Sequence, residues 1–262
     1  MILAVQTYSV HDELMHDFEG SFHRLASLGF AAYELSHLSW NEKTIRRLEA
    51  LQKELPLEVV SLQIKPDILA QRKEEIVDYA RRLHCSRVIV SMIPPRVILG
   101  SERTFFTFIA ELNSLALYYQ GQGLQLGYHH HHWEFIRLQD GESRLSHLVH
   151  DTKNIVFVND TYWTARSGVD PMDTIALFGE KLLGVHLRDI KDEASFWNVK
   201  TRDASLGEGY LHFDRIFDAL RKTPVVYAAI EQGGKDGLAH MKTSRDFLLG
   251  KDYLASDGIH FR

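Results

Sequence analysis

Eight short apolar runs, each followed by a stretch with helical spacing, constrain the fold of this chain more than any other feature of its sequence. The runs are rich in Val, Ile and Leu, and they are too apolar to leave one face of a strand in water. Such strands are typical of a parallel sheet that is covered on both faces. We therefore expect strands within segments 2–8, 31–36, 57–64, 87–93, 124–130, 154–160, 182–189 and 225–232.

The stretches between these runs carry apolar residues at every third or fourth position, as in Ile45, Leu48 and Leu51, which predicts amphipathic helices. Eight strand–helix units without a Pro-, Gly- or Ser-rich linker indicate one α/β domain over residues 1–262, a (β/α)8 TIM barrel. An open doubly wound sheet is the alternative. Such a sheet usually has a glycine-rich phosphate turn after its first strand, and residues 6–13 contain no glycine.

Composition and charge narrow the class of protein. The formal net charge is −5, so the chain offers no excess of basic residues for a nucleic-acid backbone. The single cysteine, Cys85, cannot form an internal disulfide, which is typical of a reducing compartment. No segment approaches the roughly 20 apolar residues of a membrane-spanning helix. The N-terminal segment also lacks the basic start of a signal peptide. We expect a cytoplasmic protein without nucleic-acid or membrane partners.

Polar residues at the ends of the predicted strands are the candidates for function, because active sites of closed barrels lie at the carboxyl ends of the strands. The first two strands offer Gln6, Tyr8 and Glu34 there. The last four strands, which are neighbours, offer three carboxylates and one imidazole: Glu134, Asp160, His186 and Glu231. This ligand set suits Mn²⁺, Mg²⁺ or Co²⁺, with Zn²⁺ less favoured. The alternative is that these four are merely solvated rim residues.

Six segments, in chain order, resemble motifs of the sugar phosphate isomerase/epimerase proteins. These proteins are xylose isomerase-like TIM barrels, related to inosose dehydratases and more distantly to tagatose-type epimerases and endonuclease IV. The segments are QTYSVHDEL (6–14), YHHHHWEF (128–135), NDTYWTARSGVDP (159–171), VHLRD (185–189), LGEGYLHF (206–213) and IEQ (230–232).

The resemblance implies a divalent metal and a small sugar or sugar derivative as partner. It implies that Glu134, Asp160, His186 and Glu231 are the metal ligands, with His131 or His129 as the possible substitute for Glu134. By the same resemblance, the sugar pocket is lined by His129, His131, Trp163, Arg188 and Glu208. Thr7 and His11 differ from the related motif near the first strand, where a substrate phosphate or carboxylate could be held.

The run of four histidines, His129–His132, is a natural motif in this interpretation and not a purification tag. His130 stands where the related motif has Asn, and His132 stands where it has Asp. Neighbouring side chains on an extended segment point to opposite sides, so the four imidazoles are not expected to bind one ion together.

A metal site of this kind suits proton transfer next to a carbonyl, because a metal polarises the carbonyl and stabilises an enediolate. Glu134 and Glu231 are the candidate acid and base. Return of the proton to the other face of the same carbon gives an epimer, and return to the neighbouring carbon gives an isomer. We therefore expect a metal-dependent sugar isomerase or epimerase. An inosose-type dehydratase, a non-catalytic sugar-binding barrel and a DNA repair endonuclease are the alternatives, and the acidic charge argues against the last.

The C-terminal segment 252–262 is a candidate interface for a homo-oligomer. Tyr253, Leu254, Ile259 and Phe261 lie within it, and such side chains have to be buried somewhere.

Overall fold

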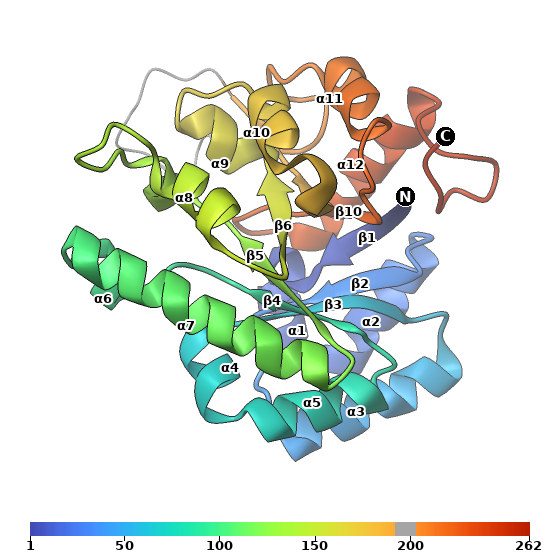
Figure 1. The fold of residues 1–262 in the computed structure, drawn as a ribbon. Helices are drawn as coiled ribbons and strands as arrows, with labels where there is room; N and C mark the ends of the chain where they lie inside the picture. Colours follow the sequence, from blue (N-terminus) through green and yellow to red (C-terminus); the bar gives the residue numbers. More distant parts are fainter. Residues whose placement is uncertain (192–202) are drawn as a thin grey trace.

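The computed structural model describes residues 1–191 and 203–262. Eight parallel strands close into a barrel in the order β1-β10-β7-β6-β5-β4-β3-β2, with helices packed around it (Figure 1). The barrel strands are β1 (Ile2–Gln6), β2 (Ala32–Leu35), β3 (Glu58–Ile64), β4 (Arg87–Val90), β5 (Gln125–His129), β6 (Ile155–Asp160), β7 (Leu182–Leu187) and β10 (Tyr227–Ile230). The predicted (β/α)8 barrel is confirmed, and each strand lies within its predicted segment. Because the first and last strands pair, we propose that residues 1–262 form one domain.

The longer helices match the predicted amphipathic stretches, and most begin at a side chain that caps the first turn. Asn41, Ser101, Ser143 and Asp170 each accept a backbone N–H of the first turn. The helices of eight residues or more are α2 (Phe18–Ser27), α3 (Glu42–Glu54), α5 (Lys73–Arg82), α7 (Glu102–Gly121), α8 (Arg144–Asp151), α10 (Pro171–Phe178), α11 (Phe213–Leu220) and α12 (Gly237–Gly250). The shorter ones are α1 (His11–His16), α4 (Pro66–Gln71), α6 (Pro95–Ile98), α9 (Thr161–Arg166) and the 3₁₀ turns η1 (Thr7–Val10), η2 (His132–Phe135) and η3 (Gly179–Lys181).

Two local features differ from the predicted pattern. The first helical stretch is divided at Asp17, whose extended backbone ends α1 and whose carboxylate accepts the N–H of Gly20 at the start of α2. After β7, a short antiparallel ribbon forms from β8 (Asp189–Ile190) and β9 (Asp203–Ala204), of which the predicted strand segments include only Asp189. Both features depend on polar side chains that helical or strand periodicity does not detect.

The interior of the barrel is filled mainly by small and branched side chains, and one tyrosine crosses it. Tyr227 is fully buried there, beside Ala4, Ala32 and Ala229. A Cβ atom on Gly184 would lie 2.5 Å from the Tyr227 ring, so glycine is needed at that position. The tyrosine hydroxyl thereby reaches Glu34, which lies next to the candidate site.

The C-terminal segment packs on its own chain. Tyr253 and Leu254 are buried, and the rings of Tyr253 and Phe261 lie 4.5 Å and 5.1 Å from the ring of Phe217. The backbone of Ile259 accepts the N–H of Leu3. These side chains therefore need no partner for burial, and a homo-oligomer stays a prediction without support from this segment.

Within residues 1–191 and 203–262, none of the helices combines the length and the apolar character that crossing a bilayer requires.

Candidate metal centre

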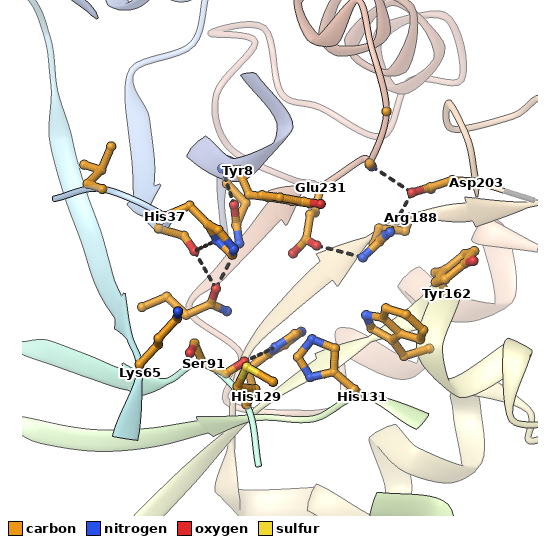
Figure 2. A pocket seen from close by; sticks show the side chains of 18 of the residues that line it. Tyr8, His37, Lys65, Ser91, His129, His131, Tyr162, Arg188, Asp203 and Glu231 are labelled. Atoms are coloured by element: carbon orange, nitrogen blue, oxygen red, sulfur yellow. Dashed lines mark hydrogen bonds and ion pairs between the residues drawn. The ribbon is translucent and has the colours of Figure 1, made fainter. Parts of the chain in front are cut away.

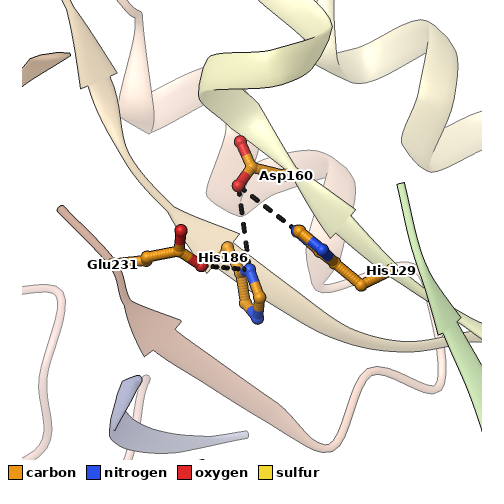
Figure 3. Close-up of side chains that lie close together, drawn as sticks. All are labelled: His129, Asp160, His186 and Glu231. Atoms are coloured by element: carbon orange, nitrogen blue, oxygen red, sulfur yellow. Dashed lines mark ion pairs between the residues drawn. The ribbon is translucent and has the colours of Figure 1, made fainter. Parts of the chain in front are cut away.

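Four buried side chains converge at the carboxyl end of the barrel (Figure 3). His129 ends β5, Asp160 ends β6, His186 lies in β7, and Glu231 follows β10 by one residue. One nitrogen or oxygen atom of each lies within 4.8 Å of the corresponding atom of every other. The parallel register causes this convergence, because it places Asp160 beside His186 and His186 beside Ala229, two residues before Glu231.

The spacing of these atoms fits the ligand shell of one cation. His186 Nδ1 lies 2.8 Å from Glu231 Oε2 and 3.7 Å from Asp160 Oδ2. His129 Nε2 lies 3.5 Å from the same Asp160 oxygen. Ligand atoms that bind a tetrahedral ion at about 2.1 Å are roughly 3.4 Å apart, which is within this range.

The hydrogen bonding of the four side chains provides a test of this interpretation. His129 Nε2, Asp160 Oδ2, His186 Nδ1 and Glu231 Oε2 are all buried, and none makes a hydrogen bond to a group outside these four side chains. Buried polar atoms in native proteins nearly always have a partner, and an ion is one explanation when they lack one. A divalent cation would coordinate all four atoms at once. Two imidazole nitrogens and two carboxylate oxygens suit Zn²⁺, Mn²⁺ or Co²⁺ better than they suit Mg²⁺, because Mg²⁺ prefers oxygen ligands alone.

Glu134, predicted as the fourth ligand, does not join this group. Strand β5 ends at His129, and the chain then turns into η2, which directs the Glu134 side chain back towards the backbone. Its Oε1 accepts the Tyr128 hydroxyl at 2.6 Å, and its Oε2 accepts the N–H of His131 at 2.9 Å. Burial raises the pKa of Glu134, with these two hydrogen bonds acting in the opposite direction. His129, one of the two histidines considered as a substitute, occupies the place expected for Glu134.

Glu34 on β2 contacts the ring nitrogen of His186 that points away from Asp160 and Glu231. Glu34 Oε1 lies 2.6 Å from His186 Nε2, and Glu34 Oε2 accepts the hydroxyls of Ser61 and Tyr227. Although burial by itself would raise the pKa of Glu34, His186 and then these hydroxyls lower it to about 2. Nε2 of His186 therefore carries a proton that it donates to Glu34, and its Nδ1 faces the site. A carboxylate behind a metal-binding histidine commonly fixes the ring in this way.

Arg188 lies beside the carboxylates and pairs with two of them. Its guanidinium donates to Glu231 Oε1 at 2.7 Å and to Asp203 Oδ2 at 2.5 Å, and lies 4.5 Å from the centre of the Tyr162 ring. Burial would lower the pKa of Arg188, but Asp203, Glu231 and Asp160 raise it well above the usual value. Arg188 thus remains charged and offsets part of the negative charge at the site. Asp203 comes from β9, and no motif or predicted strand end indicates it as a site residue.

A cavity of about 550 Å³ opens above the four converging side chains (Figure 2). Its lining includes four of the five residues predicted for the sugar pocket, namely His129, His131, Trp163 and Arg188. Its size is within the range of roughly 300–1,000 Å³ that is typical of small-molecule sites. The part of the wall formed by Gln63, Lys65 and His37 was not anticipated, because no motif marks these residues.

Glu208, the fifth predicted pocket residue, is exposed and does not line the cavity. It lies in a loop that is tied to Asp189. The backbone N–H groups of Gly207, Gly209 and Leu211 all donate to the Asp189 carboxylate. The two motifs VHLRD and LGEGYLHF are therefore joined by a structural contact.

The four consecutive histidines have four different environments. The side chain of His129 points towards the converging atoms. His130 is fully buried in the next layer, where its Nε2 accepts the N–H of Asp160, and burial lowers its pKa to about 4. His131 lines the cavity 5.2 Å from the Trp163 ring, and His132 stacks on the outer side of the same ring at 5.1 Å. As expected, the four imidazoles are not directed to one point.

Known proteins share this fold. Residues 22–248 match the family model described as xylose isomerase-like TIM barrel. A sugar phosphate isomerase/epimerase from Parabacteroides distasonis is 18% identical, with a TM-score of 0.73 over 94% of this chain and 92% of that one. A probable 3-DHS dehydratase, AsbF, from Bacillus anthracis is 16% identical, with a TM-score of 0.71 over 95% and 99%.

An IolI protein with a bound zinc atom is 10% identical, with a TM-score of 0.74 over 95% of this chain and 97% of that one. At these identities the likeness of the solved structures shows the fold alone. No curated protein sequence matches the chain.

Proposed function

The chain belongs to the xylose isomerase-like TIM barrel family, and from this premise we propose that it is a divalent-metal-dependent isomerase or epimerase of a small sugar or keto-sugar. The observation that carries the proposal is the set of four buried, unsatisfied ligand atoms beneath a cavity of sugar size. Structures that share this fold are described as a sugar phosphate isomerase/epimerase, a D-tagatose 3-epimerase-like protein and a probable dehydratase, and the IolI protein has a bound zinc atom. A cytoplasmic location is part of the proposal, in keeping with Cys85 as a free thiol.

His129, Asp160, His186 and Glu231 would hold the cation. A bound divalent cation supplies Lewis acidity, which polarises a carbonyl group and stabilises the negative charge of an enediolate. Trp163 lines the cavity with an indole N–H that has no hydrogen-bond partner, so it offers both an apolar face and a donor to a sugar.

Glu231 is our candidate for the proton acceptor. It lines the cavity, and Arg188 orients it by binding Oε1. Glu134 cannot be its counterpart in this geometry, because its carboxylate is engaged by Tyr128 and the backbone outside the cavity. His131 takes that role in our proposal. It reaches the cavity from the β5 side, and its Nδ1 has no hydrogen-bond partner. The two groups can remove and return a proton on different sides of a bound substrate.

Solvent exchange tests the proposal. The protein, loaded with Mn²⁺, Co²⁺ or Zn²⁺ in D₂O, is incubated with a panel of keto-sugars and keto-inositols and followed by NMR. We expect deuterium at a carbon next to the carbonyl of at least one compound, dependent on the metal and lost in Asp160→Asn and Glu231→Gln. Glu208→Gln, at an exposed position outside the cavity, is the matched control and should retain exchange.

Three outcomes separate the alternatives. Formation of an enone in place of an isomer would identify a dehydratase on the same site. Substrate binding without exchange would identify a sugar-binding barrel. Exchange that proceeds equally without metal would contradict the proposed mechanism.

A further inference from the structure

The cavity has two chemically different ends (Figure 2). One end lies over the metal centre and contains Arg188, Asp203 and Glu231. The other end, formed by residues of β1, β2 and β3 and the segments that follow them, contains Gln63, Lys65, His37 and Tyr8. We call this second group the donor end. Among the described residues, Asp203 and Glu231 are the acidic ones in the cavity lining, and both pair with Arg188, so the described part of the donor end contains no carboxylate.

Gln63 presents an unsatisfied amide to the cavity. The N–H of Tyr8 donates to Gln6 Oε1 at 2.6 Å, which turns the Gln6 amide nitrogen towards Gln63 Oε1, 3.0 Å away. The Ser36 hydroxyl also donates to Gln63 Oε1, at 2.8 Å. These bonds leave Gln63 Nε2 buried without any partner, on a side chain that is 4% exposed. A buried donor of this kind is costly unless a ligand satisfies it.

Lys65 adds a positive charge next to this amide. It follows the last residue of β3, two positions after Gln63, and its side chain lines the cavity with the ammonium group pointing into it (Figure 2). No salt bridge within the described part of the chain includes Lys65. Lys65 is exposed, as most lysines of the described residues are, and what distinguishes it is its place in the cavity wall.

His37 completes the donor end in a constrained conformation. Its backbone φ is 54°, in the left-handed region that residues other than glycine seldom adopt. Its Nδ1 lies 3.1 Å from the Ser36 hydroxyl, and its ring lies 4.5 Å from the Tyr8 ring. These contacts fix the position of the imidazole in the cavity wall.

We propose that the donor end binds an anionic group, a carboxylate or a phosphate, at the end of the substrate remote from the metal centre. The substrate class is therefore an acidic or phosphorylated keto-sugar and not a neutral one. The ammonium group of Lys65 and the amide NH₂ of Gln63 are hydrogen-bond donors, and no carboxylate of the described cavity lining opposes them, which suits an anionic group. The inference rests on the proposed function, because it assumes that the carbonyl end lies over the metal.

Calorimetric binding to the Mn²⁺-loaded protein tests this inference without turnover. The probes are matched sets of a neutral keto-sugar, its terminal carboxylate and its terminal phosphate: D-fructose, D-fructuronate and D-fructose 6-phosphate, with the corresponding five-carbon set. In at least one set, we expect an anionic member to bind about tenfold or more tightly than the neutral one. The carboxylate and phosphate arms show which anion is preferred.

Variants of the donor end complete the test. Lys65→Met should reduce the affinity for the anionic probe about tenfold and leave Mn²⁺ binding unchanged, and Gln63→Leu should weaken the same probe. Lys251→Met, at an exposed position after α12 and outside the cavity lining, is the matched control. Equal binding of neutral and anionic members, absence of binding by every anionic probe, or a preference that persists in Lys65→Met would overturn the inference. If anions bind through Lys65 but no probe exchanges deuterium, the proposed function fails and the anion site stands.

Discussion

The carboxylate of Glu34 determines which nitrogen of His186 faces the cavity. His186 Nε2 is 2.6 Å from Glu34, and Nδ1 is directed towards Asp160 and Glu231. Because both residues are fully buried, solvent does not compete for this contact. Glu34 therefore acts on the metal centre through His186, which it contacts directly, and is not itself one of the four candidate ligands.

Replacement of this carboxylate provides a test at the scale of one residue. We expect Glu34→Gln to lower the affinity for Mn²⁺ or Zn²⁺ by about 10- to 100-fold, because the neutral amide no longer fixes the charge and tautomer of His186. Metal titration by calorimetry checks the prediction, with circular dichroism to establish folding. Glu208→Gln should bind metal as the unchanged protein does. Unaltered affinity in Glu34→Gln would show that the contact has only a structural role.

Sequence patterns predicted some residues of the site and missed others for definable reasons. Asp160, His186 and Glu231 come directly at the ends of apolar runs, where barrel topology predicts function. Glu134 comes five residues after the end of its strand, and the 3₁₀ turn that redirects it leaves no periodic signal. Gln63 looks like an ordinary strand residue in the sequence, because its unsatisfied amide depends on Gln6 of β1 and on Ser36, the residue after β2.

The loop between β9 and α11 depends on the absence of a side chain at Gly209. A Cβ atom there would lie 2.2 Å from Asp189 Oδ1 and 2.5 Å from the Ile190 carbonyl oxygen. Asp189 could not then accept the three N–H groups of this loop. We expect Gly209→Ala to lower the free energy of unfolding by about 1–3 kcal/mol, as overpacking does.

Denaturant titration compares this variant with Gly121→Ala. A Cβ atom on Gly121, at the end of α7, would meet nothing within 4 Å. The control should therefore be as stable as the unchanged protein or slightly more stable. Equal stability of the two variants would mean that the loop adjusts without cost.

His147 makes the stability of α8 depend on pH. Its two ring nitrogens lie 2.9 Å from carboxylate oxygens of Asp140 and Asp151. Partial burial opposes the charge, but these two carboxylates outweigh it and raise the pKa of His147. A raised pKa in the folded state gives stability that is fully present below the unfolded pKa of about 6.5 and is lost as pH rises through the folded pKa.

The variant His147→Gln tests this dependence. The deficit in unfolding free energy of the variant, of the order of 1 kcal/mol, should be largest near pH 6 and should shrink as the pH rises towards 9. Urea titrations over this range provide the measurement. His150→Gln, at an exposed position of the same helix, should show no such trend. A deficit that is independent of pH would contradict a charged His147.

The sequence predicted which strands and helices exist better than it predicted where each one begins and ends. All eight barrel strands were expected, because a parallel strand covered on both faces needs a continuous apolar run. The division of the first helix at Asp17 and the ribbon β8–β9 were not expected. Capping of a helix start and pairing of two-residue strands each depend on one or two polar residues, which a periodic pattern does not resolve.

Closure of the whole barrel brings together residues that are distant in the sequence. Glu34 and His186 are 152 positions apart, and Glu34 and Tyr227 are 193 apart, yet each pair is in contact across the barrel. An open sheet would separate β2 from β7 and leave Glu34 without its partners. The metal centre thus requires a closed barrel. The residues that form it lie at or near strand ends, which the sequence predicted.

In our proposal, four side chains from β5, β6, β7 and the residue after β10 bind one divalent cation. Diffraction from crystals grown with Mn²⁺, measured at a wavelength with strong anomalous scattering by manganese, tests it most directly. We predict one anomalous peak per chain, at about 2.0–2.3 Å from His129 Nε2, Asp160 Oδ2, His186 Nδ1 and Glu231 Oε2, and its loss in Asp160→Asn. A peak elsewhere, or none at saturating Mn²⁺, would contradict the account.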